Sequence, residues 1–195
     1  MVRDTNEEDV VVDDLAARFR RVAEGFSRRT MAIDDAGWEL PAPPEGWTAR
    51  DVVGHLTTWV PAFLEAAGAP PLPPRPHVAA DPAGAWEALR SGLQGMLDDP
   101  EVAATRIEHP VAGAHALGDA IATFVLGDVL VHTWDLARAT GQDEHLDPAE
   151  VHAMLVAMEP MDEVLRTSGH YGPRVEVPPD ADEQTRLIAF TGRQP

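Results

Sequence analysis

The sequence contains no cysteine and no lysine. Without cysteine, the chain can form no disulfide bond, no thiolate nucleophile and no cysteine-ligated metal site. Any chemistry must therefore come from histidine, aspartate, glutamate, arginine and hydroxyl side chains. All fifteen basic residues are arginine, which is typical of GC-rich coding, and we infer no function from it.

Positive charge is scarce, because 33 acidic residues outweigh 15 basic ones and give a formal net charge of -18. A protein of this charge is repelled by a phosphate backbone unless it carries a local basic face. The two arginine pairs, at 20–21 and 28–29, lie in a segment rich in acids. We therefore expect no nucleic-acid partner.

The chain also lacks an uninterrupted run of the roughly 18 apolar residues that a membrane helix requires. Its first residues, MVRDTNEED, are too acidic and polar for a signal peptide. We expect a cytoplasmic protein without a membrane partner. With 195 residues, of which 44% are hydrophobic, the chain suits a single domain over residues 1–195, with 168–195 as a C-terminal extension.

Helical spacing of apolar residues dominates the rest of the chain. In residues 10–36 they recur every three, four or seven positions, as in an amphipathic helix. Further helices are expected from residue 48, and over residues 82–97, 118–140 and 148–167. Thr48 followed by Asp51 is a variant of the capping box. Asp81 before a proline predicts a helix start, and Gly141 predicts a helix end.

Only short segments are candidates for extended structure. The stretch TRIEHPVAG is partly β-branched, and residues 175–177 could form a short strand. One edge segment does not make a sheet, and the last residues are expected to form a helical turn or two. Four long helices and a shorter one, joined by shorter loops, predict an all-α four-helix bundle with an additional C-terminal helix and short extended segments.

Residues 118–140 place polar side chains on an apolar helix face. The 3.6-residue period puts Asp128, His132 and Asp135 on one inward stripe, together with Ile121, Phe124, Val125 and Leu136. An unpaired buried carboxylate costs several kcal/mol, so Asp128 requires a partner inside the protein. His132 lies one turn further along the same face.

His55 lies beside the apolar stripe of the second expected helix, so it should also point into the bundle. Two imidazoles and one carboxylate are typical ligands of a catalytic zinc or similar divalent ion, with a position left for water or substrate. We therefore identify His55, Asp128 and His132 as candidate metal ligands. The alternative is an Asp–His hydrogen bond and a satisfied core histidine, without a metal.

The remaining polar and aromatic candidates are weaker. Asp135 either orients a ligand through a hydrogen bond or forms a salt bridge with Arg138. Asp51 is assigned to the helix N-terminus rather than to a metal. Trp59 and Trp134 either wall a pocket or belong to the core. No catalytic residue is assigned, and nothing is assigned to the six histidines in loops or on acidic surface, which are His77, His109, His115, His145, His152 and His170.

Three segments carry a family resemblance: GWTARDVVGHLTTW, DVLVHTWDLARATGQD and DEQTRLIAFTGRQP. Together they resemble actinobacterial metal-binding proteins related to mycothiol-dependent maleylpyruvate isomerase, within the wider DinB-like helical bundles. The resemblance runs from about Trp38 to the C-terminus. In the isomerase a histidine of the second helix and a Glu-x-x-x-His pair of the fourth hold the metal, which implies His55, Asp128 and His132 here. Asp128 is one methylene shorter than glutamate, so ligation is either kept by a small shift of the helix or lost to a water bridge.

The resemblance implies a divalent metal, zinc or nickel, with mycothiol as a cosubstrate. The leading hypothesis is an enzyme whose metal activates a thiolate for S-transfer to, or isomerisation of, a small electrophile. The alternatives are a metal-dependent hydrolase that uses metal-activated water, and a non-catalytic metal-binding protein. A small thiol and a small-molecule electrophile are the expected partners of a monomer or homodimer.

Overall fold

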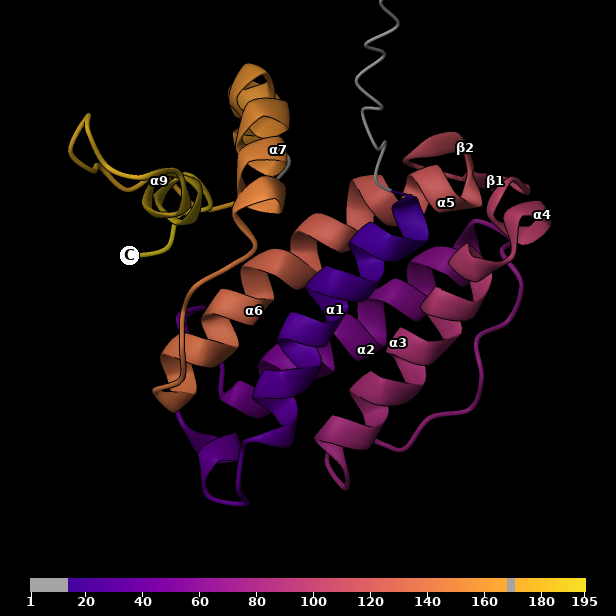
Figure 1. Cartoon of the computed structure of the whole chain (residues 1–195), viewed down its shortest axis with the longest axis horizontal. Helices are drawn as coiled ribbons and strands as arrows, with labels where there is room; N and C mark the ends of the chain where they lie inside the picture. The colour runs from indigo at the N-terminus through magenta and orange to yellow at the C-terminus, as the bar shows by residue number, and fades with distance from the viewer. Residues whose placement is uncertain (1–13, 168–170) are drawn as a thin grey trace, which may run out of the picture.

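A computed structural model of the protein describes residues 14–167 and 171–195. Four long helical segments pack side by side as a bundle (Figure 1). They are α1 (Leu15–Met31), α2 (Ala49–Ala66), α3 (Pro82–Asp98) and the continuous run of α5 (Leu117–Ala120), η2 (Ile121–Leu126) and α6 (Gly127–Thr140). The predicted all-α four-helix bundle is confirmed.

Apolar side chains from all four segments fill the interior of the bundle. The largest of those that are fully buried are Phe19, Phe26, Leu56, Leu64, Trp86, Leu89, Leu93, Leu117, Ile121, Trp134 and Leu136. Burying one side chain of this size stabilises the fold by about 1.5–3 kcal/mol relative to leaving it exposed. Packing of these faces therefore fixes how the four segments lie against one another.

The helix ends follow the capping signals of the sequence. The Thr48 N–H donates to Asp51 Oδ2 at 2.8 Å, and the Asp51 N–H donates to the Thr48 hydroxyl oxygen at 3.3 Å, which completes a capping box at the start of α2. Asp81 caps α3 through its side chain. Gly141 ends α6 in the left-handed conformation, with φ of 66°.

The fourth segment differs from a regular α-helix in its middle, where η2 is a π-helix. A π turn bonds each residue to the one five positions away, so it rotates the side chains that follow it. By length and apolarity the run Leu117–Thr140 would suffice to cross a membrane, but 72% of its most apolar window is buried inside the protein. It is the core helix of the bundle.

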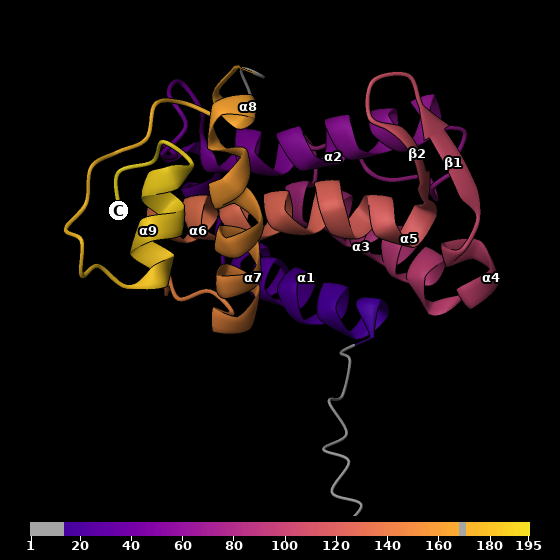
Figure 2. The same ribbon diagram turned by 90° about the horizontal axis from the view of Figure 1, so that it is seen from above.

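The fifth expected helix is interrupted. It consists of α7 (Pro148–Met158), a 3-10 turn η3 (Glu159–Met161) and α8 (Asp162–Thr167), because Pro160 lacks an N–H and cannot continue a regular helix. Figure 2 shows α7 and α8 lying across α6. The last helix, α9 (Glu183–Phe190), packs beside α7 and buries its four final residues, which are Leu187, Ile188, Ala189 and Phe190.

The extended segments also differ from expectation. Arg106–His109 (β1) pairs antiparallel with Gly113–Ala116 (β2), so the stretch expected as a lone edge segment forms a hairpin. Residues 175–177 do not form a strand, although the Val175 N–H donates to the Ala189 carbonyl at 3.0 Å. Short helices η1 (Gly37–Glu39) and α4 (Pro100–Ala103) complete the described elements.

Candidate metal centre

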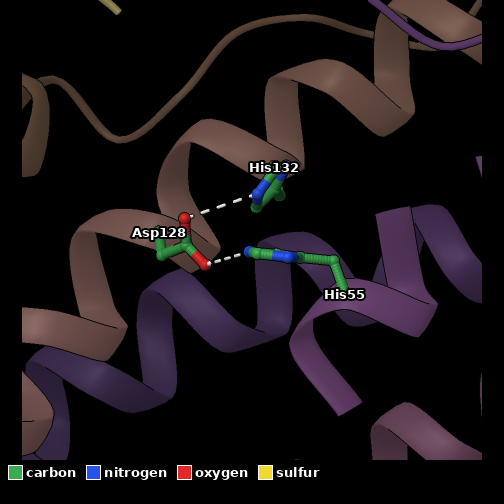
Figure 3. A group of neighbouring side chains, drawn as sticks. All are labelled: His55, Asp128 and His132. Atoms are coloured by element: carbon green, nitrogen blue, oxygen red, sulfur yellow. Dashed lines mark hydrogen bonds and ion pairs between the residues drawn. The ribbon is translucent and has the colours of Figure 1, made fainter. Parts of the chain in front are cut away.

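His55 on α2 and the pair Asp128 and His132 on α6 point toward one another (Figure 3). His55 Nε2 lies 3.1 Å from Asp128 Oδ2, and His132 Nε2 lies 3.4 Å from Asp128 Oδ1. Each residue offers one ligand atom within 4.8 Å of the other two. The structure therefore brings the three candidate ligands together.

Regular helix geometry places these side chains. Asp128 and His132 are one turn apart, so they project from the same face of α6. His55 lies about two turns after the capping residue Thr48. The capping box fixes where α2 begins, and the packing of α2 against α6 turns His55 toward Asp128.

The three side chains differ in burial. His132 keeps 5% of its side-chain exposure, whereas Asp128 keeps 26% and His55 keeps 33%. The group is therefore sealed on the side of His132 and open to solvent on the side of His55. His55 and Asp128 are thus the two candidate ligands in partial contact with solvent.

Burial and the attraction between the carboxylate and the imidazoles shift the pKa values of Asp128 and His132 in opposite directions. Burial alone would raise the pKa of Asp128 and lower the pKa of His132, because it disfavours the charged forms. Attraction outweighs burial: His132 and His55 hold the pKa of Asp128 well below its usual range. The carboxylates of Asp128 and Asp135 raise the pKa of His132 to about 9. Without a metal, His132 is therefore an imidazolium at neutral pH.

Asp135 lies on the far side of the His132 ring. Its Oδ2 is 2.8 Å from His132 Nδ1, and Arg193 Nε and Nη2 donate to its two carboxylate oxygens at 2.7 Å each. Burial opposes ionisation of Asp135, but these two partners lower its pKa. The predicted alternative partner, Arg138, instead pairs with Glu144 at 2.7 Å. Asp135 thus orients the ring so that Nε2 faces Asp128.

Two tryptophans border the group. Trp59 Nε1 donates to Asp128 Oδ2 at 2.8 Å. The Trp47 ring stacks on His132 with centroids 5.8 Å apart and lies 5.1 Å from the His55 ring. Trp134, the other tryptophan considered from the sequence, is buried in the core beneath the guanidinium of Arg138.

A row of half-buried rings continues from the group to the β-hairpin. Trp59 contacts Phe63 at 5.9 Å between centroids, and Phe63 contacts Phe124 at 5.3 Å. His109 stacks on Phe63 at 4.6 Å, and His115 meets Phe124 at 5.4 Å. These five residues, Trp59, Phe63, Phe124, His109 and His115, are called the aromatic row below. All five of its side chains are partly exposed.

Three residues at the site were not predicted from the sequence. Trp47 lies just before the helix cap, within the GWTARD motif, which is the signal that could have indicated it. Arg193 lies within the DEQTRLIAFTGRQP segment that carries part of the resemblance, whereas Tyr171 carries no local pattern. Burial raises the pKa of Tyr171, and the charge of Asp128 raises it further, so Tyr171 lies within electrostatic reach of the site.

The other histidines hold no comparable group among the described residues. His77 accepts a hydrogen bond from the Ala79 N–H, His145 pairs with Asp143, and His152 pairs with Glu183. His170 lies outside the described residues. In the ranges 14–167 and 171–195, His55, Asp128 and His132 form the group of three that could hold a metal ion.

The donor set and its spacing fit a divalent ion. Ligand atoms about 2.0–2.1 Å from a tetrahedral ion are separated by roughly 3.3 Å. His55 Nε2 and His132 Nε2 approach different oxygens of Asp128, at 3.1 and 3.4 Å, and one ligand atom from each residue lies within 4.8 Å of the other two. The Nδ1 atom of His132 is engaged by Asp135, as is usual for an imidazole that ligates through Nε2.

Comparison with known proteins identifies a family for this chain. The family described as mycothiol maleylpyruvate isomerase N-terminal domain matches residues 19–137, which include all three candidate ligands and Asp135. Comparison with curated proteins and with solved structures gives no significant match. Arg193 and Tyr171 lie beyond the matched range. Because the match covers more than half of the chain and agrees with its DinB-like helical bundle, the chain belongs to the mycothiol maleylpyruvate isomerase N-terminal domain family.

Proposed function

We propose that the protein binds one divalent metal ion through His55, Asp128 and His132. The ion would activate a small thiol such as mycothiol, either for transfer of the thiol to a small electrophile or for thiol-dependent isomerisation of that electrophile. The observation that carries the proposal is the convergence of these side chains at ligand spacing, with one side open to solvent. Zinc and nickel both suit two imidazoles and a carboxylate. Membership of the mycothiol-related family supports the thiol.

The charge of the ligand set favours a thiolate. Two neutral imidazoles and one carboxylate leave one net positive charge on a divalent site, which a thiolate neutralises. A bound divalent cation would lower the pKa of a thiol and hold it as the nucleophile. Two neighbouring side chains orient the ligands. Asp135 fixes the His132 ring, and Trp59 donates a hydrogen bond to Asp128 Oδ2.

The surroundings of the site suit an unsaturated electrophile. The aromatic row begins at Trp59, which donates to Asp128, and continues through Phe63 and Phe124 to the histidines of the hairpin. Flat rings of this kind bind planar conjugated groups by stacking and exclude water around them. We propose that the electrophile lies on this row while the thiol approaches beside His55. We also propose that residues 1–195 act as one domain, with the 168–195 extension contributing Arg193 to the site.

Metal content tests the ligand assignment. We would measure it by elemental analysis of untagged protein purified without added metal, for the wild type, His55→Ala and the control His77→Ala, whose histidine is exposed and is not one of the three candidate ligands. We expect about one ion per chain in the wild type and the control, and none in His55→Ala. Equal metal in all three proteins would reject the site.

Thiol consumption tests the reaction. Zinc-loaded protein would be incubated with mycothiol and an α,β-unsaturated carbonyl compound, and the free thiol followed with time. We expect consumption above the background rate only when metal, thiol and intact His55 are present. Ester hydrolysis without a thiol would instead support the hydrolase. Thiol-dependent isomerisation regenerates the thiol, so it would be followed by the absorbance of the unsaturated compound instead. Bound metal with none of the three activities would support a non-catalytic metal-binding protein.

A further inference from the structure

A cleft of about 340 Å³ lies on a different face of α6 from the candidate metal centre. It is bounded by α1, α6 and the connection of residues 142–147, which returns from the end of α6 toward α7 (Figure 1). Val22, Leu130 and Leu146 supply apolar walls, and Arg21, Arg28 and Arg29 supply three guanidinium groups. This grouping is unusual in a chain with a net charge of -18.

Arg29 is a buried arginine that main-chain carbonyls hold in place in the wall of this cleft. It is only 7% exposed, and its guanidinium donates to main-chain carbonyls on both sides of the cleft. Nε and Nη2 bond to the Asp143 carbonyl, Nη2 also bonds to the His145 carbonyl, and Nη1 bonds to the Gly25 carbonyl at 2.8 Å. Within residues 14–167 and 171–195, no carboxylate forms an ion pair with Arg29. The charge of Asp143 partly compensates this cation and opposes the lowering of the Arg29 pKa by burial.

One donor of Arg29 remains unused. An arginine has five N–H groups, and four of them account for the bonds above. The fifth, on Nη1, has no acceptor within the described part of the chain. Nη1 lies 3.8 Å from the point where a Cβ at position 25 would stand, and Arg28 Nη2 lies 4.0 Å from the same point. Gly25 thus leaves open the spot where two guanidinium groups converge.

The charges that line the cleft are mixed, because Glu24 and Asp147 accompany the three arginines. Arg28 has no ion-pair partner among the described residues. Burial lowers the pKa of Arg29, Asp143 opposes this, and the charge of Arg28 lowers the pKa further. The third arginine, Arg21, forms ion pairs with Asp147 and Glu150 at 3.5 Å each. An anion between the other two guanidinium groups would relieve their repulsion and accept the unused N–H.

We propose that this cleft binds a small organic oxyanion, with its carboxylate or phosphate group over Gly25 between Arg28 and Arg29. The apolar walls receive a short hydrocarbon body, and the volume lies at the lower end of the range for small-molecule sites. The cleft is separate from the candidate metal centre, because Leu130 and Thr133 line it while Asp128 and His132 face α2. The proposal therefore does not depend on the proposed function.

Titration calorimetry on the full chain at low ionic strength tests the proposal, with butyrate and inorganic phosphate as separate probes. In Gly25→Ala, a methyl group would occupy the anion position, and its contacts of 3.8 Å or more are ordinary van der Waals contacts, so the helix is preserved. We expect saturable binding to the wild type, and at least tenfold weaker binding to Gly25→Ala and to Arg28→Gln. Tighter binding of butyrate would assign a carboxylate with an apolar body, and tighter binding of phosphate would assign a phosphate.

Arg20→Gln is the matched control, because Arg20 is exposed on the same helix, pairs with Asp98 and lies outside the cleft. It should bind the probe as the wild type does. If neither probe saturates the wild type, or if Gly25→Ala and Arg28→Gln bind it as tightly as Arg20→Gln does, an adventitious ion only is present and the proposal fails. Metal content should be the same in all four proteins, which separates this test from that of the metal centre.

Discussion

Arg193 and Asp135 form a bidentate ion pair, in which Nε and Nη2 of the arginine donate to the two carboxylate oxygens at 2.7 Å each. Asp135 has no exposed surface, and its other partner is the His132 ring. The pair joins positions 58 residues apart in the sequence. The C-terminus of the chain thereby sets the orientation of a candidate metal ligand on α6.

Replacing Arg193 with alanine should weaken both the fold and the metal site. Removing one partner of a buried ion pair costs about 3 kcal/mol, because the other charge stays buried. Loss of an orienting partner of a metal-bound imidazole lowers metal affinity by about tenfold or more. Chemical unfolding and metal titration would measure the two effects. Arg186→Ala is the control, since Arg186 forms an exposed pair with Glu159 and should change stability by less than about 1 kcal/mol. Equal effects of both substitutions would contradict the orienting role.

Substitutions at Asp128 should separate the effect of its negative charge on zinc affinity from the effect of its side-chain length. Asp128→Asn keeps the shape but removes the negative charge, so zinc affinity should fall by about 100-fold or more. Asp128→Glu keeps the charge and restores the longer carboxylate of the isomerase, so it should retain about one ion per chain. Competition with a chromophoric chelator would measure both. If the Asn variant bound zinc as tightly as the wild type, Asp128 would be a structural residue only.

Much of the candidate site follows from local pattern. Asp128 and His132 are four residues apart on an otherwise apolar stripe, and helix period alone places them together. His55 follows from the same reasoning on α2, because a polar residue beside an apolar stripe must find its partner inside the bundle. The capping residues Thr48, Asp81 and Gly141 were also predictable, because each cap depends on a few adjacent residues.

Other features depend on contacts that one segment cannot reveal. Arg193 meets Asp135 only because the C-terminal segment returns to α6. The hairpin was missed because its second strand, GAHA, is made of small residues and His115 rather than of β-branched ones. The break at Pro160 was a local signal that the periodicity of the surrounding residues obscured. The π-helix η2 has no signature in the sequence IATFVL.

Thr48→Ala should destabilise the start of α2. The substitution removes the hydroxyl oxygen that accepts from the Asp51 N–H, and loss of such a cap costs about 1 kcal/mol. Denaturant unfolding would measure the change. Thr58→Ala is the control, because Thr58 is exposed on the same helix and caps nothing. A cost as small as that of Thr58→Ala would mean that the capping box does not stabilise α2.

The raised pKa of His132 makes the stability of the metal-free protein depend on pH. The folded pKa of about 9 exceeds the unfolded value of 6.5, so protonated His132 contributes stability that is complete below about pH 6.5 and is lost as pH rises through 9. A shift of this size corresponds to about 3 kcal/mol. Denaturant unfolding at intervals from pH 6 to 9.5, with a chelator present, should therefore give a falling free energy of unfolding. His77→Gln should follow the wild-type curve.

Zinc affinity should depend on pH in the opposite direction from the stability of the metal-free protein, because a metal-bound imidazole must be neutral. Zinc therefore displaces the His132 proton at any pH below about 9, and the work of removing that proton decreases as pH rises. Between pH 6.5 and 9 the affinity should rise by up to tenfold per pH unit, and binding at neutral pH should release protons to the buffer. Calorimetry in buffers of different ionisation enthalpy would count them. An affinity independent of pH in this range, with no proton released, would mean that zinc binds without His132 and would remove it from the ligand set.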